Sequence, residues 1–412
     1  MTAMGLSDIM TLFYRQADGV KMNRDLEQKK SIRPFLDKFA EVLRQRVGDK
    51  KEPLFLMQGG YGKHNTGDDT LLRVAIEQVR EIYPDARVVA LAYNPEFLKE
   101  SYGIEAIPFK LKRIIPILKS CDAQILASGG LVNDIDFDSY LKKLLTPRGK
   151  FVFLTVKYML MRKKPTVVFG VGLHLIPNFL VRWLMKSTLP KVALLSVRDE
   201  YSIKVLNEIG VKDYFFHHDP ALIFRKKYEQ SKEDIREKYG IKRQRYIFFN
   251  FRYTKNEGDT RSAVRESVEY IRRVAEKYPD HDILMVPFSV HPTFELENDV
   301  IAHREIKQTA EKQHGVNNLV LVENYQTADE IKNIAEHSDL LILTRHHAPV
   351  LTYETGVPTV VVSYNLKCRE FAELGGYKYV IDYEDITADA LMKMTDEVLE
   401  GTKSSGDVKR WL

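Results

Sequence analysis

The stretch from His337 to Gly376 decides the fold, and it reads HSDLLILTRHHAPVLTYETGVPTVVVSYNLKCREFAELGG. Asp339–Leu343 is an apolar run with the length of a buried strand, and Thr359–Tyr364 is a second run rich in β-branched residues. Between them, Pro349 suits the first turn of a helix, where its missing N–H costs nothing. A Gly-Val-Pro sequence, Gly356–Pro358, ends that helix. The stretch therefore predicts a strand, a helix and a second strand parallel to the first.

Polar residues follow both predicted strands at the same edge. Thr344–His347 comes directly after the first strand, and Lys367 follows the second. Ligands of open α/β sheets bind at the carboxyl ends of the strands. Arg345, His347 and Lys367 would meet there above a helix N-terminus, whose free N–H groups favour negative charge. We therefore expect an anionic ligand at this edge.

The same alternation of strands and helices extends over most of the chain, on both sides of a charged connecting segment at 226–245, where we place the domain boundary. Predicted strands are Leu54–Met57, Arg87–Ala92, Ala123–Ala127, Thr166–Gly170, Ala193–Val197, Tyr214–His217, Tyr246–Asn250, Ile283–Pro287, Leu319–Val322, Leu340–Leu343, Thr359–Ser363 and Tyr379–Asp382. Predicted helices include Ser31–Gln45, Asp69–Tyr83, Ser262–Tyr278, Asp329–His337 and Ala388–Leu399. This alternation is typical of parallel sheets covered on both faces. The predicted fold class is α/β, with two Rossmann-like domains facing a cleft in a GT-B-like architecture.

The chain length also favours two domains, because single cores rarely grow past about 250–300 residues and this chain has 412. We expect a helical N-terminal extension at residues 1–50 and a first Rossmann-like domain at 51–228. The second Rossmann-like domain would occupy 229–400, and a tail 401–412.

Composition excludes several classes of protein. With 44% hydrophobic and 29% charged residues the chain is typical of a globular protein, and a net charge of +5 is too weak to indicate nucleic-acid binding. Cys121 and Cys368 predict neither a disulfide framework nor a metal cluster. No signal-peptide pattern or membrane-spanning run is found, so we expect a cytoplasmic protein. Contact with the inner face of a membrane remains an open alternative. The segment Ile176–Leu189 is apolar but includes Arg182, Trp183 and Lys186, so it could lie on a bilayer surface. We favour the interpretation that it is an ordinary helix facing the core.

Two glycine-rich loops follow strands of the first predicted domain. Gly59–Asp69 matches neither the dinucleotide fingerprint nor the Walker loop. In it, Lys63 and Asn65 are candidates for touching substrate, and Asp68 or Asp69 is the expected helix cap. Ser128–Leu131, with Gly129 and Gly130, repeats the arrangement after a later strand. Two such loops at one edge indicate a platform for a ligand.

Two further arginines end predicted strands. Arg198 does so in the first domain, and its guanidinium suits a carboxylate or a phosphate. The next residue, Asp199, is interpreted as a helix cap, and Asp219 as a residue that positions the site. Arg252 ends the first strand of the second domain, where a purely structural role is equally compatible with the sequence.

Together these motifs resemble the polysaccharide pyruvyl transferase family, over roughly Phe55–Gly375. The family's Arg-Leu-His-Ala element reads Arg-His-His-Ala at 345–348, and its Ser-Tyr-Asp-Pro-Lys element reads Ser-Tyr-Asn-Leu-Lys at 363–367. Its first loop, Gly-x-x-Asn-x-Gly-Asp-Glu, and its Val-Arg-Asp-x-x-Ser element fall at 62–69 and 197–202. The family's His and Lys correspond to His347 and Lys367.

The resemblance implies transfer of a pyruvyl group from phosphoenolpyruvate to a sugar of a cell-surface polysaccharide or its precursor, forming a pyruvate ketal. The acceptor would be a glycan or a lipid-linked or nucleotide-linked sugar on the first domain, with the donor on the second. Phosphoenolpyruvate would be a substrate, and no cofactor or metal is expected. The expected catalytic residues are His347 as general acid, Arg198 and Lys367. Expected substrate-binding residues are Arg345, Asn65, Lys63, Gly129, Gly130 and Arg252.

Adjacent residues at a strand end point in opposite directions. We therefore predict that His347 faces the site and that His346, at a position the family usually fills with Leu, packs behind it.

Two other functions remain open from the sequence. A GT-B-type glycosyltransferase that uses a nucleotide-sugar would share the architecture, and Glu370 and Glu373 could then contact the ribose. A non-catalytic glycan- or nucleotide-binding protein is disfavoured, because binding alone does not require a titratable histidine.

Overall fold

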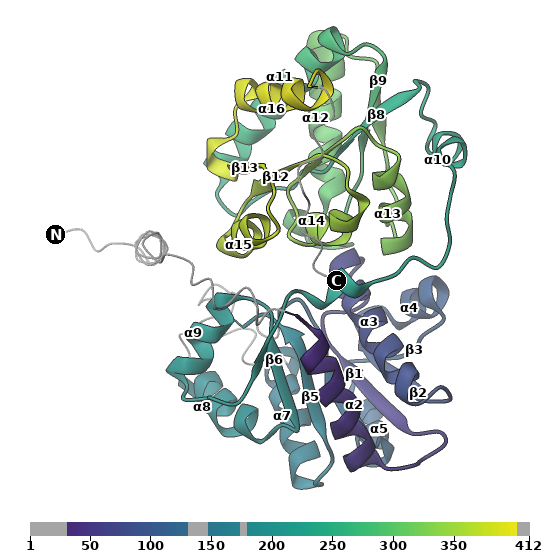
Figure 1. Ribbon diagram of the computed structural model, residues 1–412, viewed down its shortest axis with the longest axis vertical. Helices are drawn as coiled ribbons and strands as arrows, with labels where there is room; N and C mark the ends of the chain where they lie inside the picture. Colours follow the sequence, from purple (N-terminus) through teal and green to yellow (C-terminus); the bar gives the residue numbers. More distant parts are fainter. Residues whose placement is uncertain (1–30, 131–146, 174–178, 402–412) are drawn as a thin grey trace, which may run out of the picture.

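Two parallel β-sheets, one above the other, form the two halves of the molecule in the computed structural model (Figure 1). The structure describes residues 31–130, 147–173 and 179–401. The predicted 1–30 part of the N-terminal extension and the tail from 402 lie outside these residues. Strands of the first sheet all precede residue 217, and those of the second begin at Arg245. The predicted α/β fold with two Rossmann-like halves is confirmed.

The first sheet has the strand order β3-β2-β1-β4-β5-β6-β7. Its strands are β1 Leu54–Gln58, β2 Arg87–Ala92, β3 Glu105–Pro108, β4 Ala123–Leu126, β5 Thr166–Val171, β6 Leu194–Val197 and β7 Phe215–Phe216. All pairs are parallel, and Met57 of β1 lies between Ala90 of β2 and Ile125 of β4. The direction of the chain across the sheet reverses between β1 and β4, which is where ligands bind in such sheets.

Helices cover both faces of this sheet. They are α2 Arg33–Val47, α3 Thr66–Ile82, α4 Pro95–Tyr102, α5 Leu111–Ser120, α7 Pro147–Met161, α8 Phe179–Thr188 and α9 Glu200–Glu208. Phe55 and Met57 belong to the core under α2 and α3, whereas Leu56 between them packs with Ile114 and Leu118 of α5 on the other face. This alternation follows from the two-residue repeat of a strand. Right-handed crossovers place α7 and α8 on the α5 face as well.

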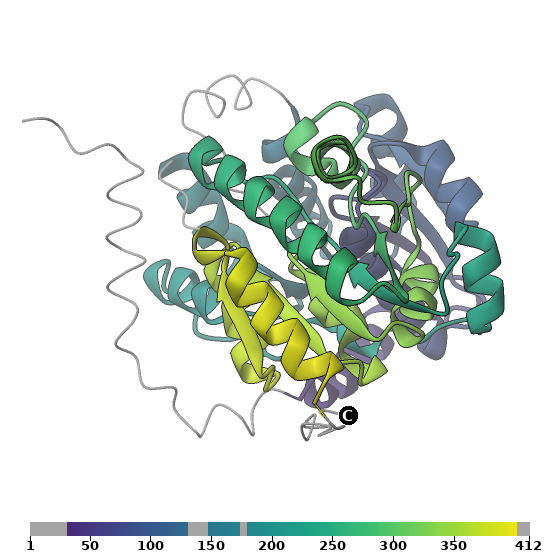
Figure 2. The same cartoon turned by 90° about the horizontal axis from the view of Figure 1, so that it is seen from above.

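The second sheet has the order β10-β9-β8-β11-β12-β13. Its strands are β8 Arg245–Phe249, β9 His281–Met285, β10 Leu319–Leu321, β11 Leu340–Leu343, β12 Thr359–Ser363 and β13 Tyr379–Asp382. Its helices are α10 Lys232–Tyr239, α11 Glu257–Lys277, α12 Asp299–His314, α13 Ala328–Glu336, α14 His347–Thr352, α15 Leu366–Leu374 and α16 Ala388–Leu399. Seen from above, α16 in yellow runs alongside the long green helix α11 (Figure 2).

The twelve predicted strands are all present, with ends shifted by up to two residues. The additional strand β3 was missed because it is a four-residue edge strand whose side chains are exposed or half-buried, so it lacks an apolar run.

The two halves touch through α3 of the first and α13 of the second. Arg73 on α3 forms a buried ion pair with Asp329 on α13, whose other carboxylate oxygen accepts from the Lys227 N–H at 2.7 Å. At the start of α3, the Thr66 N–H donates to Phe288 O (3.0 Å), and the Thr66 hydroxyl donates to Gln326 O (2.6 Å). The loop before α3 is thereby held against the second half of the chain.

Candidate active site

His347 and Arg198 come from different halves of the chain and meet between them. His347 is the first residue of α14 and lies four positions after the end of β11 at Leu343, and Arg198 directly follows β6. The Arg198 Nη1 lies 3.1 Å from His347 Nε2. Because a guanidinium can only donate, Nε2 accepts this hydrogen bond and carries a lone pair.

Arg198 is held by two further contacts. Its Nη1 forms an ion pair with Asp219, and its Nη2 donates to Gly129 O at 2.6 Å. Asp219 also lies 3.4 Å from His346 Nε2 and 3.7 Å from His347 Nε2. Burial opposes the charge on Asp219, but Arg198 and the two imidazoles outweigh it and hold the pKa of this carboxyl well below its usual range. Asp219 therefore remains anionic and orients all three partners.

Lys367 approaches the same place from the start of α15. Its Nζ lies 3.3 Å from Asp199 Oδ2. Asp199 caps α9 by accepting from the Ser202 N–H at 2.7 Å, as the sequence predicted. Burial would raise the pKa of the Asp199 carboxyl, but Lys367, the Ser202 hydrogen bond and Arg198 together lower it.

Gly172 shows how tightly Lys367 and the glycine-rich loop are packed. A Cβ added at Gly172 would lie 2.7 Å from Lys367 Nζ and 2.7 Å from Gly129 O, the atom that accepts from Arg198. Gly130 pairs with Gly172 in an isolated bridge. The three predicted catalytic residues are thus gathered around Gly129 and Gly172, with His347 and Lys367 supplied by the second half of the chain and Arg198 by the first.

Gly67 packs against the imidazole of His347. A Cβ at Gly67 would lie 2.0 Å from His347 Nδ1, so any side chain there would displace the ring. Since the Nδ1 edge faces the start of α3, Nε2 is the nitrogen left for substrate. Sequence reasoning missed this role, although a glycine two residues into a helix is a signal of close approach, because helix interiors disfavour glycine.

The cap of α3 is Asn65, and the prediction of Asp68 or Asp69 was wrong. Asn65 Oδ1 accepts from the N–H groups of Gly67 (3.1 Å) and Asp68 (3.4 Å). Asp68 is instead used to join the two glycine-rich loops, because its Oδ1 accepts from the Gly129 N–H at 2.9 Å. Asp69 is buried and accepts from the Gly62 N–H (3.0 Å) and the Tyr325 hydroxyl (3.0 Å).

His346 and His347 both approach Asp219, so the prediction that they point in opposite directions was wrong. His346 already has helical backbone angles, with φ −54° and ψ −46°, so the pair starts a helix and does not continue the strand. Of the two, it is His347 that forms a hydrogen bond with Arg198 in the described part of the chain. Burial lowers the pKa of His347 well below its usual value. The carboxylate of Asp219 acts to raise this pKa, and the charge of Arg198 acts to lower it further. His347 is therefore neutral near pH 7 in the free protein.

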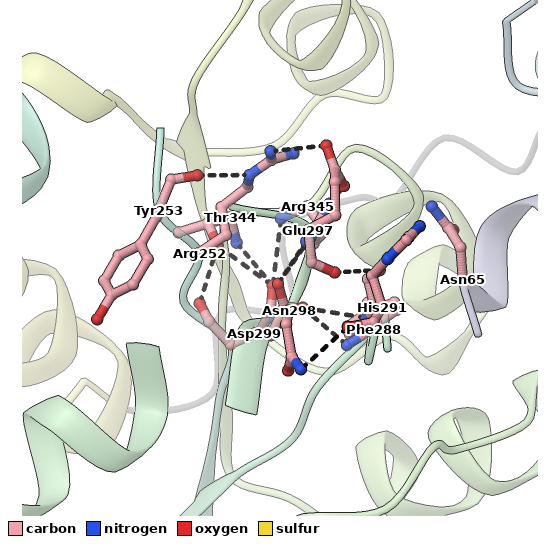
Figure 3. A network of polar contacts seen from close by, with 12 residues as sticks. Asn65, Arg252, Tyr253, Phe288, His291, Glu297, Asn298, Asp299, Thr344 and Arg345 are labelled. Carbon is pink, nitrogen blue, oxygen red and sulfur yellow. Dashed lines mark hydrogen bonds and ion pairs between the residues drawn. The ribbon is translucent and has the colours of Figure 1, made fainter. Parts of the chain in front are cut away.

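Arg345 and Arg252 belong to a separate network on the second half of the chain (Figure 3). Arg345 donates to Asp299 Oδ1 through Nε (2.9 Å) and Nη2 (2.6 Å), and its Nη1 donates to Glu297 Oε2 at 2.6 Å. Arg252 Nη2 lies 3.3 Å from the other oxygen of Glu297, and its guanidinium stacks 4.4 Å from the Tyr364 ring. Arg345 thus neutralises two carboxylates and ties the end of β11 to the start of α12. Its predicted contact with substrate stays a prediction.

The other predicted substrate-binding residues have structural contacts of their own. Lys63 Nζ lies 4.3 Å from the centre of the Tyr93 ring, and Asn65 caps α3. Neither contact tests the predicted role in binding. The predicted anion site at the N-terminus of α14 draws little on the helix dipole, because α14 has only six residues.

Asp219, His346 and His347 also form a group with the geometry to hold a metal ion. Their ligand atoms lie within 4.8 Å of one another, the one such group in the described part of the chain. The Arg198 guanidinium occupies the space beside Asp219 Oδ2 and His347 Nε2. A divalent cation there would have to displace it, so a metal fits this site poorly.

The model of one known family, polysaccharide pyruvyl transferase, matches residues 65–365. The chain belongs to this family. The match begins at the Asn65 cap and ends just before Lys367, so it covers Arg198 and His347. No curated protein sequence matches the chain.

The solved structures to which the chain is similar include several UDP-N-acetylglucosamine 2-epimerases. A putative UDP-N-acetylglucosamine 2-epimerase from Listeria monocytogenes has 16% identity and a TM-score of 0.55, over 86% of this chain and 90% of that one. The UDP-GlcNAc 2-epimerase from Methanocaldococcus jannaschii has 14% identity and a TM-score of 0.56, over 85% and 93%. That from Neisseria meningitidis, bound to UDP-GlcNAc, has 13% identity and a TM-score of 0.53, over 85% and 92%. At such low identity these likenesses show the fold alone, and they confirm the predicted GT-B-like architecture.

None of the described helices combines the length and the apolar character needed to cross a bilayer.

Proposed function

We propose that this pyruvyl transferase takes its pyruvyl group from phosphoenolpyruvate and transfers it to two hydroxyls of a sugar, releasing phosphate and forming a pyruvate ketal. One observation carries the proposal: His347 lies 3.1 Å from the guanidinium of Arg198, and the Lys367 ammonium lies beside Gly172, next to Gly129. Phosphoenolpyruvate has a phosphate and a carboxylate, which two fixed cations suit, and a methylene carbon that must be protonated.

The reaction needs one proton donor and two anion-holding groups. His347 would give a proton to the methylene carbon, which makes C2 electrophilic. A sugar hydroxyl then bonds to C2 and returns its proton to the imidazole. The C2–O bond to phosphate breaks as a second hydroxyl closes the ketal, and its proton leaves with the phosphate. Arg198 and Lys367 would stabilise the charge on the departing phosphate.

Substrate binding would also charge the histidine. In the free protein His347 Nε2 accepts from Arg198, which together with burial keeps the imidazole neutral. An anion that draws the guanidinium onto itself would free Nε2 and favour its protonation. Binding of phosphoenolpyruvate would therefore protonate His347, the form that acts as the general acid. Proton uptake on binding, measured by calorimetry in buffers of different ionisation enthalpy, supports this step, and its absence contradicts it.

The alternative is transfer from a nucleotide-sugar, which the shared fold with UDP-GlcNAc epimerases would permit. Glu370 and Glu373, the residues considered for ribose, are otherwise engaged: Glu370 accepts from the Glu200 N–H at 3.1 Å, and Glu373 lies 3.3 Å from Arg369. Thermal stabilisation by phosphoenolpyruvate but not by UDP or UDP-sugars is expected. The opposite result would favour the alternative.

The decisive experiment couples phosphate release to mass spectrometry over a panel of glycan, nucleotide-linked and lipid-linked acceptors. We expect phosphate release with one acceptor class, together with the mass gain of a pyruvate ketal. Because Arg198 competes with a metal for Asp219, turnover should survive a chelator. Loss of turnover that Mg²⁺ restores would overturn the metal-free mechanism.

A further inference from the structure

Three helices on one face of the first domain contain no acidic residue. They are α5 (LKRIIPILKS), α7 (PRGKFVFLTVKYMLM) and α8 (FLVRWLMKST), and together they contain eight lysines and arginines. The chain as a whole is nearly balanced, with 62 basic and 57 acidic residues, so this bias is local. Because α5 contacts α7 and α7 contacts α8, the three helices form one continuous surface. The cations described as exposed on it are Lys112, Arg113, Lys119, Lys157, Arg182 and Lys186.

The same surface exposes large apolar side chains. Of the eight that are exposed among the described residues, five lie here: Leu111, Ile115, Leu154, Met161 and Trp183. Their exposed fractions run from 43% for Ile115 to 68% for Met161. We call the surface formed by these five residues and the exposed lysines and arginines of the same helices the α5–α7–α8 face. Each helix still buries its other side, as Ile114 and Leu118 do on α5.

Cationic side chains are interleaved with the apolar ones. Lys157 stands between Leu154 and Met161 on α7, and its ammonium lies 5.6 Å from the Trp183 ring. Lys186 follows Trp183 on α8 and is exposed. Among the described residues, Glu208 of the neighbouring α9 is an acidic residue beside this surface, and it lies 3.6 Å from Arg182. The sequence-based preference for a core-facing α8 therefore describes Leu184 and Met185 but not Trp183.

We propose that the α5–α7–α8 face binds the surface of an anionic lipid bilayer. Helices that lie in a membrane interface combine exposed Trp and Leu with Lys and Arg, which meet the lipid phosphates. The cores of protein interfaces, by contrast, are depleted in lysine, whereas Lys157 lies in the middle of this face. The inference is independent of the reaction catalysed. It would hold the domain that carries Arg198 at a membrane surface.

The full-length protein should sediment with vesicles of phosphatidylcholine and phosphatidylglycerol, but not with phosphatidylcholine alone, and high salt should release it. Lys157→Glu with Lys186→Glu should weaken binding at least about 25-fold, since each cation near an anionic surface is worth about five-fold. Leu154→Ser with Trp183→Ser should weaken it about ten-fold or more. The control pair Lys393→Glu and Phe294→Ser, exposed on the other domain, should leave binding unchanged.

Trp183 offers a direct readout, because the chain has only one other tryptophan, Trp411. In a Trp411→Phe protein, anionic vesicles should shift the Trp183 emission to the blue, and brominated lipids should quench it. Failure to bind anionic vesicles, or binding that the four face substitutions leave unchanged in folded protein, would overturn the proposal. So would a dimer in solution that Trp183→Ser dissociates, since the face would then be a protein interface.

Discussion

At the scale of single residues, the two adjacent histidines should differ sharply in their contribution to catalysis. His347→Ala removes the imidazole that contacts Arg198 and should lower kcat by about 10²–10⁴-fold, the usual worth of a general acid. Affinity for phosphoenolpyruvate should fall much less, because Arg198 and Lys367 remain. His346→Leu should keep kcat within about ten-fold, since Asp219 retains Arg198 as its partner.

Steady-state kinetics on variants with native circular dichroism check this assignment. It fails if His347→Ala turns over at a near-native rate, or if His346→Leu is the inactive variant.

Gly67 provides a test of geometry without removing any catalytic group. Gly67→Ala would place a methyl group 2.0 Å from His347 Nδ1, so the ring must move away from its position. We expect a loss of kcat comparable to that of His347→Ala. Unfolding stability should also fall, by about 1–3 kcal/mol, because the added methyl group overpacks a buried contact. Thermal melts and kinetics on the same sample measure both effects.

Gly258→Ala, in the first turn of α11 with only the Asn256 side chain within 3.4 Å, is the matched control and should leave kcat unchanged. A fully active Gly67→Ala would show that His347 does not depend on this contact.

At the scale of elements, Arg345 is expected to stabilise the junction between the end of β11 and the start of α12 more than it binds substrate. Arg345→Met leaves the buried carboxylate of Asp299 without its ion-pair partner and should cost about 3–5 kcal/mol of unfolding free energy. In the unsubstituted protein, burial raises the pKa of Glu297, but the charges of Arg345 and Arg252 lower it by more, to about 2. Urea unfolding measures the effect.

Arg304→Met is the control, because Arg304 makes an exposed ion pair with Glu323 that is worth at most about 1 kcal/mol. If Arg345→Met has native stability but binds phosphoenolpyruvate weakly, the substrate-binding role predicted from the sequence is the correct one.

At the scale of the whole molecule, Asp69 couples the contact between the halves to pH. Tyr325, its partner across the interface, is in turn bonded to Tyr102. Burial raises the pKa of Asp69 to about 7, and the Gly62 N–H opposes this. The folded state then holds a proton that the unfolded state has lost, so stability should fall as pH rises. The expected loss between pH 5 and pH 7 is about 2 kcal/mol.

Asp69→Asn keeps an acceptor for Gly62 without the charge, so its stability should lack this component. Urea unfolding of both proteins at several pH values measures the difference. Equal pH dependence of wild type and variant would contradict the coupling.

Much of the fold was determined locally along the chain. Runs such as Leu340–Leu343 and Thr359–Ser363 are strands with the predicted bounds, because a buried parallel strand needs a continuous apolar segment and little else. The edge strand Glu105–Pro108 has no such segment and could be found only from its pairing with β2. Strand-end placement likewise predicted where Arg198, His347 and Lys367 would lie.

What those residues contact depends on the packing of the two halves. The sequence determined which residue types stand at the strand ends, since strand periodicity and glycine-rich turns are short-range properties. Only the tertiary structure decided that Arg198 contacts His347 across the domain interface, that Gly67 must lack a side chain, and that Arg345 is held by Asp299 and Glu297. These are contacts between segments more than 40 residues apart, and nothing local along the chain encodes such distances.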